Sequence, residues 1–256
     1  MELEVNKLLK VLKLSAQIII ENGGETYRAE ETIKYICKSF KVKEIEPIAT
    51  PTGLYFTISV NGEENNTIVR RIRKRTINLQ KINEVNNTSR NLTSGQITLD
   101  EALLQLEDIY GNDKIQYKYS LLYGGISSAF FTLLFGGGLF EFTVALFSGI
   151  IVTIISGKFE ELQSYQFFSS IIAGAFLSFI AITFTHLLGK GNYNYIIVGG
   201  IMPLLPGLAM TNAIRDTIRG DLLSGIARAT EALLIASSLA AGAGAIIYTA
   251  YTLGLS

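Results

Sequence analysis

The sequence predicts a membrane α-helical bundle of about five transmembrane helices, preceded by a small soluble α/β domain. Of the 44 charged residues, 33 precede Ser120 and 11 follow it, so the two parts of the chain suit different solvents. The later part holds long uncharged runs, and about 20 mostly apolar residues cross a bilayer as a helix. The earlier part alternates between helical and strand periodicity. We therefore expect domains at residues 1–115 and 116–256.

The elements of the first domain follow from hydrophobic spacing and turn signals. A first helix with Leu8, Leu12 and Ile19 on one face is expected to end at Gly23-Gly24. A second helix buries Ile33, Ile36, Cys37 and Phe40. Alternation from Leu54 to Val60 predicts a strand, and Asn61-Gly62 predicts a hairpin turn into a strand at 67–72. Helices are expected at 77–92 and, after a capping box formed by Thr98 and Glu101, through Ile109.

The second domain is predicted from five uncharged runs, which are residues 119–140, 142–157, 162–189, 191–214 and 232–256. The second run is the shortest and needs Glu141 or Lys158 at its ends, where long side chains reach the headgroups. With the N-terminus inside, six Lys and Arg residues lie on the inner side and only Lys190 on the outer side. We expect a multi-pass plasma-membrane protein with a cytoplasmic N-terminus and an external C-terminus.

Composition excludes several classes of function. One cysteine (Cys37) permits no internal disulfide, and one histidine (His186) permits no His/Cys metal site, so neither metal nor cofactor is expected. The chain has no phosphate-binding GxxxxGK[ST] loop. Residues 1–119 carry 17 Lys and Arg against 16 Asp and Glu, so the basic run at 70–75 is interpreted as a solvated edge and no nucleic-acid partner is expected.

The fourth uncharged run contains prolines that are expected to break its helix. Pro203 and Pro206 each remove a backbone donor, and Gly207 follows directly. Broken helices near the bilayer midplane expose helix ends to a carboxylate or an ion in many transporters. The alternative is a kinked helix whose prolines pack against neighbours. We expect Pro203, Pro206 and Gly207 to be substrate-binding residues.

Charged and polar residues follow this break at helical spacing. Asn212, Arg215, Asp216 and Arg219 occupy one face at i, i+3, i+4 and i+7, and Arg228 and Glu231 are paired similarly. An arginine here can pair with a substrate carboxylate, and Asp216 or Glu231 can carry a coupling proton. The alternative is a set of interfacial ion pairs that anchor helix ends. Asn212, Arg215, Asp216, Arg228 and Glu231 complete the expected substrate-binding set.

Three ordered sets of motifs resemble the threonine/serine exporter family, whose relatives include a two-subunit bacterial succinate exporter. The first is Glu21–Glu30, with the letters ENGGETYRAE. The second is Thr50–Gly53, joined by Asn83–Arg90 and the helix at 98–109. The third runs from Met202–Gly207 through residues 212–216, 220–222 and 225–228 to Glu231. The resemblance implies a cytoplasmic-side domain and a five-helix bundle that exports small hydroxylated amino acids or dicarboxylates.

Within these motifs, polar residues beside the Gly-Gly turn suit a gate or a domain-docking edge. The expected gating or docking residues are Gly24, Glu25, Thr26, Arg28, Glu30, Asn86 and Arg90. The acidic residues at this helix start also suit the helix dipole, which is the structural alternative.

The resemblance also implies a partner, because full-length members carry a second five-helix half. We expect a smaller five-helix membrane subunit of the same family as partner, a homo-oligomer as another arrangement, and a small polar carboxylate as substrate. Two other functions were weighed: a membrane-tethered hydrolase, and a regulatory or scaffold subunit that transports nothing. A hydrolase would need a base for its Ser or Thr nucleophile, and His186 is expected at the opposite membrane face.

Overall fold

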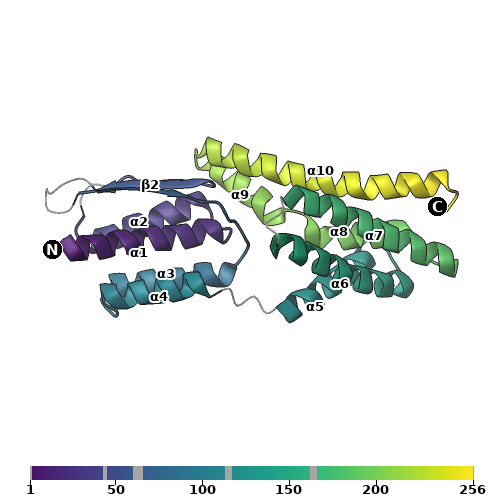
Figure 1. The fold of residues 1–256 in the computed structure, drawn as a ribbon, viewed down its shortest axis with the longest axis horizontal. Coiled ribbons are helices and arrows are strands. Elements are labelled where there is room, and N and C mark those ends of the chain that lie inside the picture. The colour runs from purple at the N-terminus through teal and green to yellow at the C-terminus, as the bar shows by residue number, and fades with distance from the viewer. Residues whose placement is uncertain (1, 43–44, 60–65, 113–116, 162–165, 256) are drawn as a thin grey trace. The chain divides into compact units, whose positions relative to one another are not determined.

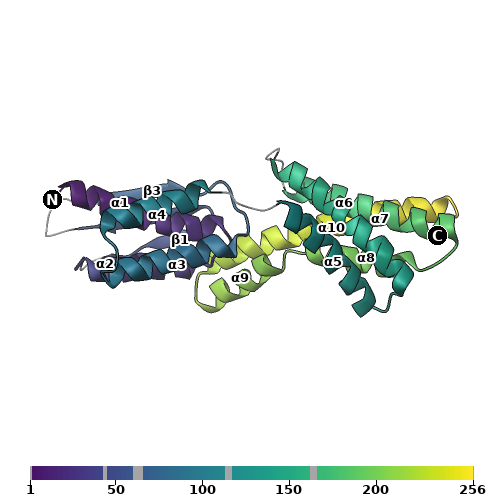
Figure 2. The same cartoon turned by 90° about the horizontal axis from the view of Figure 1, so that it is seen from below.

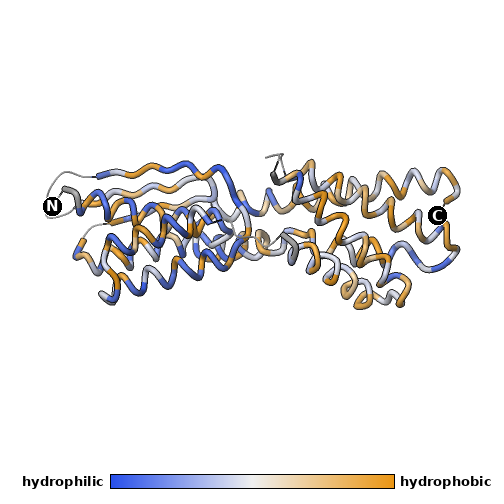
Figure 3. Tube along the Cα trace, turned by 60° about the horizontal axis from the view of Figure 1, so that its bottom comes forward, coloured by the Kyte–Doolittle hydropathy of each residue, from blue (hydrophilic) through white to orange (hydrophobic). Residues whose placement is uncertain are grey.

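The protein was examined as a computed structural model that describes residues 2–42, 45–59, 66–112, 117–161 and 166–255. The chain forms two compact units, drawn as a ribbon in Figure 1. The first unit combines residues 1–114 with residues 208–229, and the second combines residues 115–207 with residues 230–256. Hydropathy differs between them: helices α5 to α8 are mostly hydrophobic along the tube in Figure 3, whereas α1 to α4 mix both kinds of residue.

Four helices of the first unit enclose its core. They are α1 (Glu2–Glu21), α2 (Thr26–Ser39), α3 (Leu79–Thr93) and α4 (Leu99–Gly111). Helix α1 packs against the other three, and its Leu12 and Ile19 are completely buried together with Ile33 of α2. The helical spacing predicted this face. The chain leaves α1 through Gly23, whose φ of +87° favours glycine.

A three-stranded antiparallel sheet, in the order β1-β2-β3, completes this core. The strands are β1 (Ile48–Thr50), β2 (Gly53–Ile58) and β3 (Asn66–Arg71). Leu54, Phe56 and Ile58 point inward and are buried, as the alternation predicted. Strand β3 begins one residue before the predicted range, because Ile58 pairs with Asn66. The expected Asn61-Gly62 turn and Val60 lie outside the described residues.

Side-chain caps fix the starts of α3 and α4. Asn78 accepts a hydrogen bond from the Lys81 N–H at 3.1 Å. The predicted capping box is confirmed, since Thr98 accepts from the Glu101 N–H and the Thr98 N–H donates to Glu101 at 2.7 Å.

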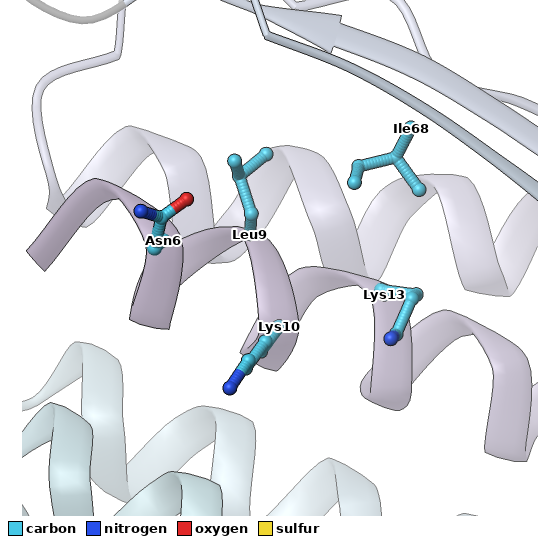
Figure 4. Close-up of a pocket in the computed structure, with 5 residues that line it drawn as sticks. All are labelled: Asn6, Leu9, Lys10, Lys13 and Ile68. Atoms are coloured by element: carbon cyan, nitrogen blue, oxygen red, sulfur yellow. The ribbon is translucent and has the colours of Figure 1, made fainter. Parts of the chain in front are cut away.

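A shallow hollow of about 390 Å³ lies between α1 and β3, lined by Asn6, Leu9, Lys10, Lys13 and Ile68. Figure 4 shows Leu9 extending on the side of α1 where Ile68 lies, while Lys10 and Lys13 extend on the other side. The lining residues therefore do not converge on a common point that would hold a small ligand.

The second unit is built from apolar helices. They are α5 (Tyr117–Leu134), α6 (Leu139–Glu161), α7 (Gln166–Leu188), α8 (Tyr193–Ile201), a 3₁₀ turn η1 (Met202–Leu204), and the part of α10 (Leu222–Thr252) beyond Ala229. Three helices of the described chain, within α6, α7 and α10, are long and apolar enough to cross a membrane. A fourth span results if α8 with η1 is joined to α9 (Gly207–Ile218) across their break.

The first predicted run forms a shorter apolar helix than expected. Residues 119–134 of α5 are helical, and the helix ends before Gly136, which has a φ of +99°. The described helices thus support a membrane protein with three to four candidate spans, and the count of five stays a prediction.

Glycines let the helices of the second unit approach closely. A Cβ added to Gly242 of α10 would lie 2.0 Å from the carbonyl oxygen of Ile171 in α7. One added to Gly174 would lie 2.4 Å from the carbonyl oxygen of Leu239. Small residues at helix contacts are typical of membrane bundles, where packing rather than hydrophobicity drives association.

Candidate functional site around the Gly23–Thr26 turn

The break predicted in the fourth uncharged run is confirmed. Helix α8 gives way to η1, and Leu205 then takes an extended conformation with a ψ of 140°. Helix α9 begins at Gly207, directly after Pro206. The two flanking segments, Tyr193–Leu204 and Gly207–Ile218, are bent by 52° and are long and apolar enough to cross a membrane only when taken together, so they form either a broken span or a re-entrant loop.

Helix α9 presents its polar residues to the turn between α1 and α2. Asn212 is 1% exposed and donates from Nδ2 to the Gly23 carbonyl at 2.9 Å. Asp216, one helical turn later, is fully buried and accepts from the Thr26 hydroxyl at 3.0 Å. Their i, i+4 spacing places both on the face that the sequence predicted.

Arg228 of α10 completes this arrangement from the other side. Its Nη2 donates to the Gly24 carbonyl at 2.8 Å, and its Nε lies 3.1 Å from Asp216 Oδ2. The second contact lacks hydrogen-bond alignment and is therefore an ion pair. Both side chains are buried, with 7% of Arg228 and none of Asp216 exposed.

Helices α9 and α10 follow one another as a hairpin (Figures 1 and 2), and Asp216 of α9 pairs with Arg228 of α10. The hairpin turns at Gly220, which has a φ of +92°, and a Cβ on Gly225 would lie 2.1 Å from the Thr217 hydroxyl. Glycine is thus required at the helix contact, because a larger residue would separate α9 from α10.

Glu25 lies between two arginines. One carboxylate oxygen pairs with Arg215 of α9 and the other lies 3.5 Å from Arg28. Burial raises the pKa of Glu25, but hydrogen bonds from its own backbone N–H and from Arg215, with the charges of both arginines, outweigh it and hold the pKa below its usual value. Glu25 is therefore ionised at neutral pH.

Next to this pair, Arg219 is held at the protein surface. Its guanidinium lies 3.8 Å from the ring centre of Tyr27 and 3.3 Å from the carboxylate of Glu31. Half of the Arg219 side chain is exposed, so solvent weakens both contacts.

The turn itself is rigidly supported. The Asn22 side chain donates to the Ile18 carbonyl at 2.7 Å, and the N–H groups of Thr76 and Asn78 donate to the carbonyls of Glu21 and Asn22. A Cβ on Gly24 would lie 2.4 Å from a methyl group of Ile19, so only glycine fits there. We call the group Gly23, Gly24, Glu25, Thr26, Asn212, Arg215, Asp216 and Arg228 the turn cluster.

The structure joins two sets of residues that the sequence analysis kept apart. Glu25, Thr26 and Gly24, expected to gate or dock, contact Arg215, Asp216 and Arg228, expected to bind substrate. Arg28 is connected to these residues through its ion pair with Glu25. No motif spacing indicated these contacts, since the partners are about 190 to 204 residues apart in sequence.

The other candidate residues lie elsewhere. Glu30 accepts a hydrogen bond from the Ala49 N–H at 2.8 Å, and burial raises its pKa. Asn86 and Arg90 lie on α3, half-buried and exposed respectively, and no described hydrogen bond links their side chains to the turn cluster. Glu231 lies half-buried in α10, among the residues of the second unit.

Around the break, Pro203 and Gly207 are exposed and Pro206 is half-buried. These three residues belong to the second unit, whereas the turn cluster belongs to the first. Their assignment to substrate binding stays a prediction.

Apolar helices of spanning length, together with a further apolar pair of helices separated by a break at Pro206, define the protein as an α-helical membrane protein. The chain belongs to the threonine/serine exporter family: the family model described as "Putative threonine/serine exporter" matches residues 10–250.

A relative named "Probable threonine/serine exporter" from Mycobacterium tuberculosis is 18% identical over 243 residues. The match covers 94% of this chain and 46% of that protein, so the chain spans about half the length of this curated relative. No solved structure matches the chain.

Proposed function

We propose that this chain is a subunit of a membrane transporter that exports small polar carboxylate metabolites: threonine and serine, or a dicarboxylate such as succinate. The observation that carries the proposal is the break at Leu205–Pro206 inside an apolar segment of a chain from this family. The positive end of the helix dipole lies at the start of α9, where it would stabilise a bound carboxylate. Transporters use such broken helices for anionic substrates.

We also propose that the turn cluster acts as a gate. Arg228 and Asp216 are buried and bonded to one another, so their charges are already compensated within the protein. Arg215 differs, because 55% of its side chain is exposed while it pairs with Glu25. A substrate carboxylate can therefore compete with Glu25 for Arg215, and that exchange would release the Glu25 side of the α1–α2 turn from α9.

A second subunit of about five helices is proposed as the partner. Two related halves with an odd number of spans have opposite orientations when placed in tandem, and such inverted pairs form midplane sites in several transporter folds. The Lys and Arg bias of this chain favours a single orientation, with the N-terminus in the cytoplasm and the C-terminus outside. Copies of this chain alone would then lack the inverted half.

Export of serine, threonine and succinate should be measured from cells that express this chain with and without a short membrane protein of the same family. The strain should lack all other members of the family. We expect export only when both chains are present. Full export by this chain alone would contradict the proposed partner, and no export of any of the three compounds by the pair would contradict the transport function.

A further inference from the structure

Glu141 is a nearly buried carboxylate in the first turn of α6, and the proposed function does not use it. Only 8% of the residue is exposed. Its Oε2 accepts a hydrogen bond from the Gly138 N–H at 2.8 Å, and its Oε1 accepts one from the Asn192 N–H at 2.9 Å. One carboxylate therefore connects the loop that enters α6 with the loop that enters α8.

The surrounding backbone is shaped for this side chain. A Cβ on Gly138 would lie 3.1 Å from Oε2, and a Cβ on Gly191 would lie 3.0 Å from Oε1. Gly191 also has a φ of +81°, which favours glycine. The close approach of two glycines leaves the carboxylate surrounded by backbone, where each N–H points to a different oxygen.

No cation neutralises Glu141 within the described chain. The titratable residues at this end of the elements packed on α6 are His186, Lys190, Tyr193 and Tyr195. None of them forms a described hydrogen bond or ion pair with Glu141. In the part of the chain that the structure describes, the carboxylate is held by backbone donors and by the N-terminal end of α6.

Protonation would weaken the two connections. An ionised carboxylate accepts at both oxygens with its negative charge, whereas a carboxylic acid carries an O–H donor on one oxygen and accepts less well there. Both hydrogen bonds would also lose the assistance of the charge. The neutral side chain therefore holds the α6 loop and the α8 loop more weakly than the ionised side chain does.

We propose that Glu141 is a protonation-sensitive positioning residue that fixes the start of α8, the first half of the broken helix, against the start of α6. The ionised form holds both loops, and the protonated form holds them more weakly. Asn192 strengthens the link, because its side chain caps α8 by accepting from the Asn194 N–H at 2.9 Å. The inference depends on the contacts of the second unit and not on transport.

Hydrogen–deuterium exchange of the full chain in detergent micelles tests this inference. Wild-type protein, Glu141→Gln and Glu101→Gln should be compared, with rates corrected for the intrinsic effect of pH. Glu101 is the matched control, because its carboxylate also accepts a hydrogen bond from a backbone N–H, that of Thr98 at the cap of its own helix, at 2.7 Å. No described hydrogen bond links Glu101 to a second loop. The readout is the protection of the Gly138 and Asn192 amides.

A hydrogen bond to a charged acceptor corresponds to roughly 10- to 100-fold in an equilibrium constant. We expect the wild-type protein to lose at least tenfold of the protection at Gly138 or Asn192 between about pH 8 and about pH 2, a range that extends well below the pKa of a free carboxylate. Amides of β2 should stay protected in the same samples. Glu141→Gln keeps only one acceptor oxygen, so it should lack the protection of the Gly138 or the Asn192 amide at neutral pH and show no pH dependence there. Glu101→Gln should match wild type.

Two results would overturn the inference. One is protection in Glu141→Gln equal to that of wild type at neutral pH. The other is wild-type protection at both amides that stays constant across the titration range while β2 remains folded. The wild-type series needs no variant, so it decides the question even where Glu141→Gln does not fold.

Discussion

Removing one partner of the buried Asp216–Arg228 pair should destabilise the protein far more than removing an exposed pair. Arg228→Leu leaves the fully buried Asp216 carboxylate without its cation and the Gly24 carbonyl without a donor. A buried charge left without its partner costs about 3–5 kcal/mol. Asp216→Leu leaves the Arg228 guanidinium without the Asp216 charge and the Thr26 hydroxyl without its acceptor. It should cost a similar amount.

The double variant Asp216→Leu/Arg228→Leu should lose less than the sum of the two single losses. It removes both charges, and it leaves the Gly24 carbonyl and the Thr26 hydroxyl unpaired, at about 1–3 kcal/mol each. A double-mutant cycle should therefore give a coupling free energy in the range of about 0.5–3 kcal/mol found for residues in contact. Coupling of this size reports direct contact between α9 and α10 at these residues.

Arg219→Ala is the matched control for this cycle. Arg219 pairs with Glu31 at 3.3 Å, with 51% and 62% of the two side chains exposed, and such pairs contribute about 0.2–1 kcal/mol. Equilibrium unfolding in detergent micelles, followed by circular dichroism, measures all four variants. Loss of stability in Arg228→Leu no larger than in Arg219→Ala would refute the buried pair.

Three further predictions follow from the same structure and sequence. Reporter fusions should find the N-terminus in the cytoplasm and the C-terminus outside, and a cytoplasmic C-terminus would break either the count of five spans or the orientation. Replacing Pro203 and Pro206 by Ala should leave expression and folding intact but reduce export, because a continuous helix ties up the backbone groups that the break frees; unchanged export would remove the break from the mechanism. The lowered pKa of Glu25 means that its stabilising effect is complete above the unfolded-state pKa and is lost as pH falls through the lower folded-state pKa. Glu25→Gln should therefore reduce stability at neutral pH and weaken its acid dependence, and an unaltered unfolding profile against pH would contradict the Arg215 contact.

Much of the first unit follows from local patterns in the sequence. Hydrophobic spacing predicted the buried faces of α1 and β2, and the capping box at Thr98 predicted the start of α4. Hydrophobic spacing also predicted the buried face of α2 except for Phe40, which lies just after the helix and is 36% exposed. Proline chemistry predicted the break after Met202. These features depend on neighbouring residues, which is why one sequence is enough to find them.

Long-range contacts could not be predicted in the same way. The boundary expected near residue 115 treated everything after it as one domain, and the compact units instead place Leu208–Ala229 with the N-terminal residues. Helical spacing correctly grouped Asn212 with Asp216, but it could not identify the Gly23 carbonyl and Thr26 as their partners. Glu141 was interpreted only as the end of a span, because its contact with Asn192 depends on the approach of two loops.

The most direct test of the account is efflux from proteoliposomes that contain purified chain and its proposed partner subunit. Vesicles loaded with labelled serine, threonine or succinate should release at least one of these compounds faster than protein-free vesicles with the same load. Vesicles that contain the Pro203→Ala/Pro206→Ala chain should release that compound more slowly than vesicles with the wild-type chain. The proposal that this chain is part of an exporter would be contradicted if correctly folded and assembled protein released all three compounds no faster than protein-free vesicles do.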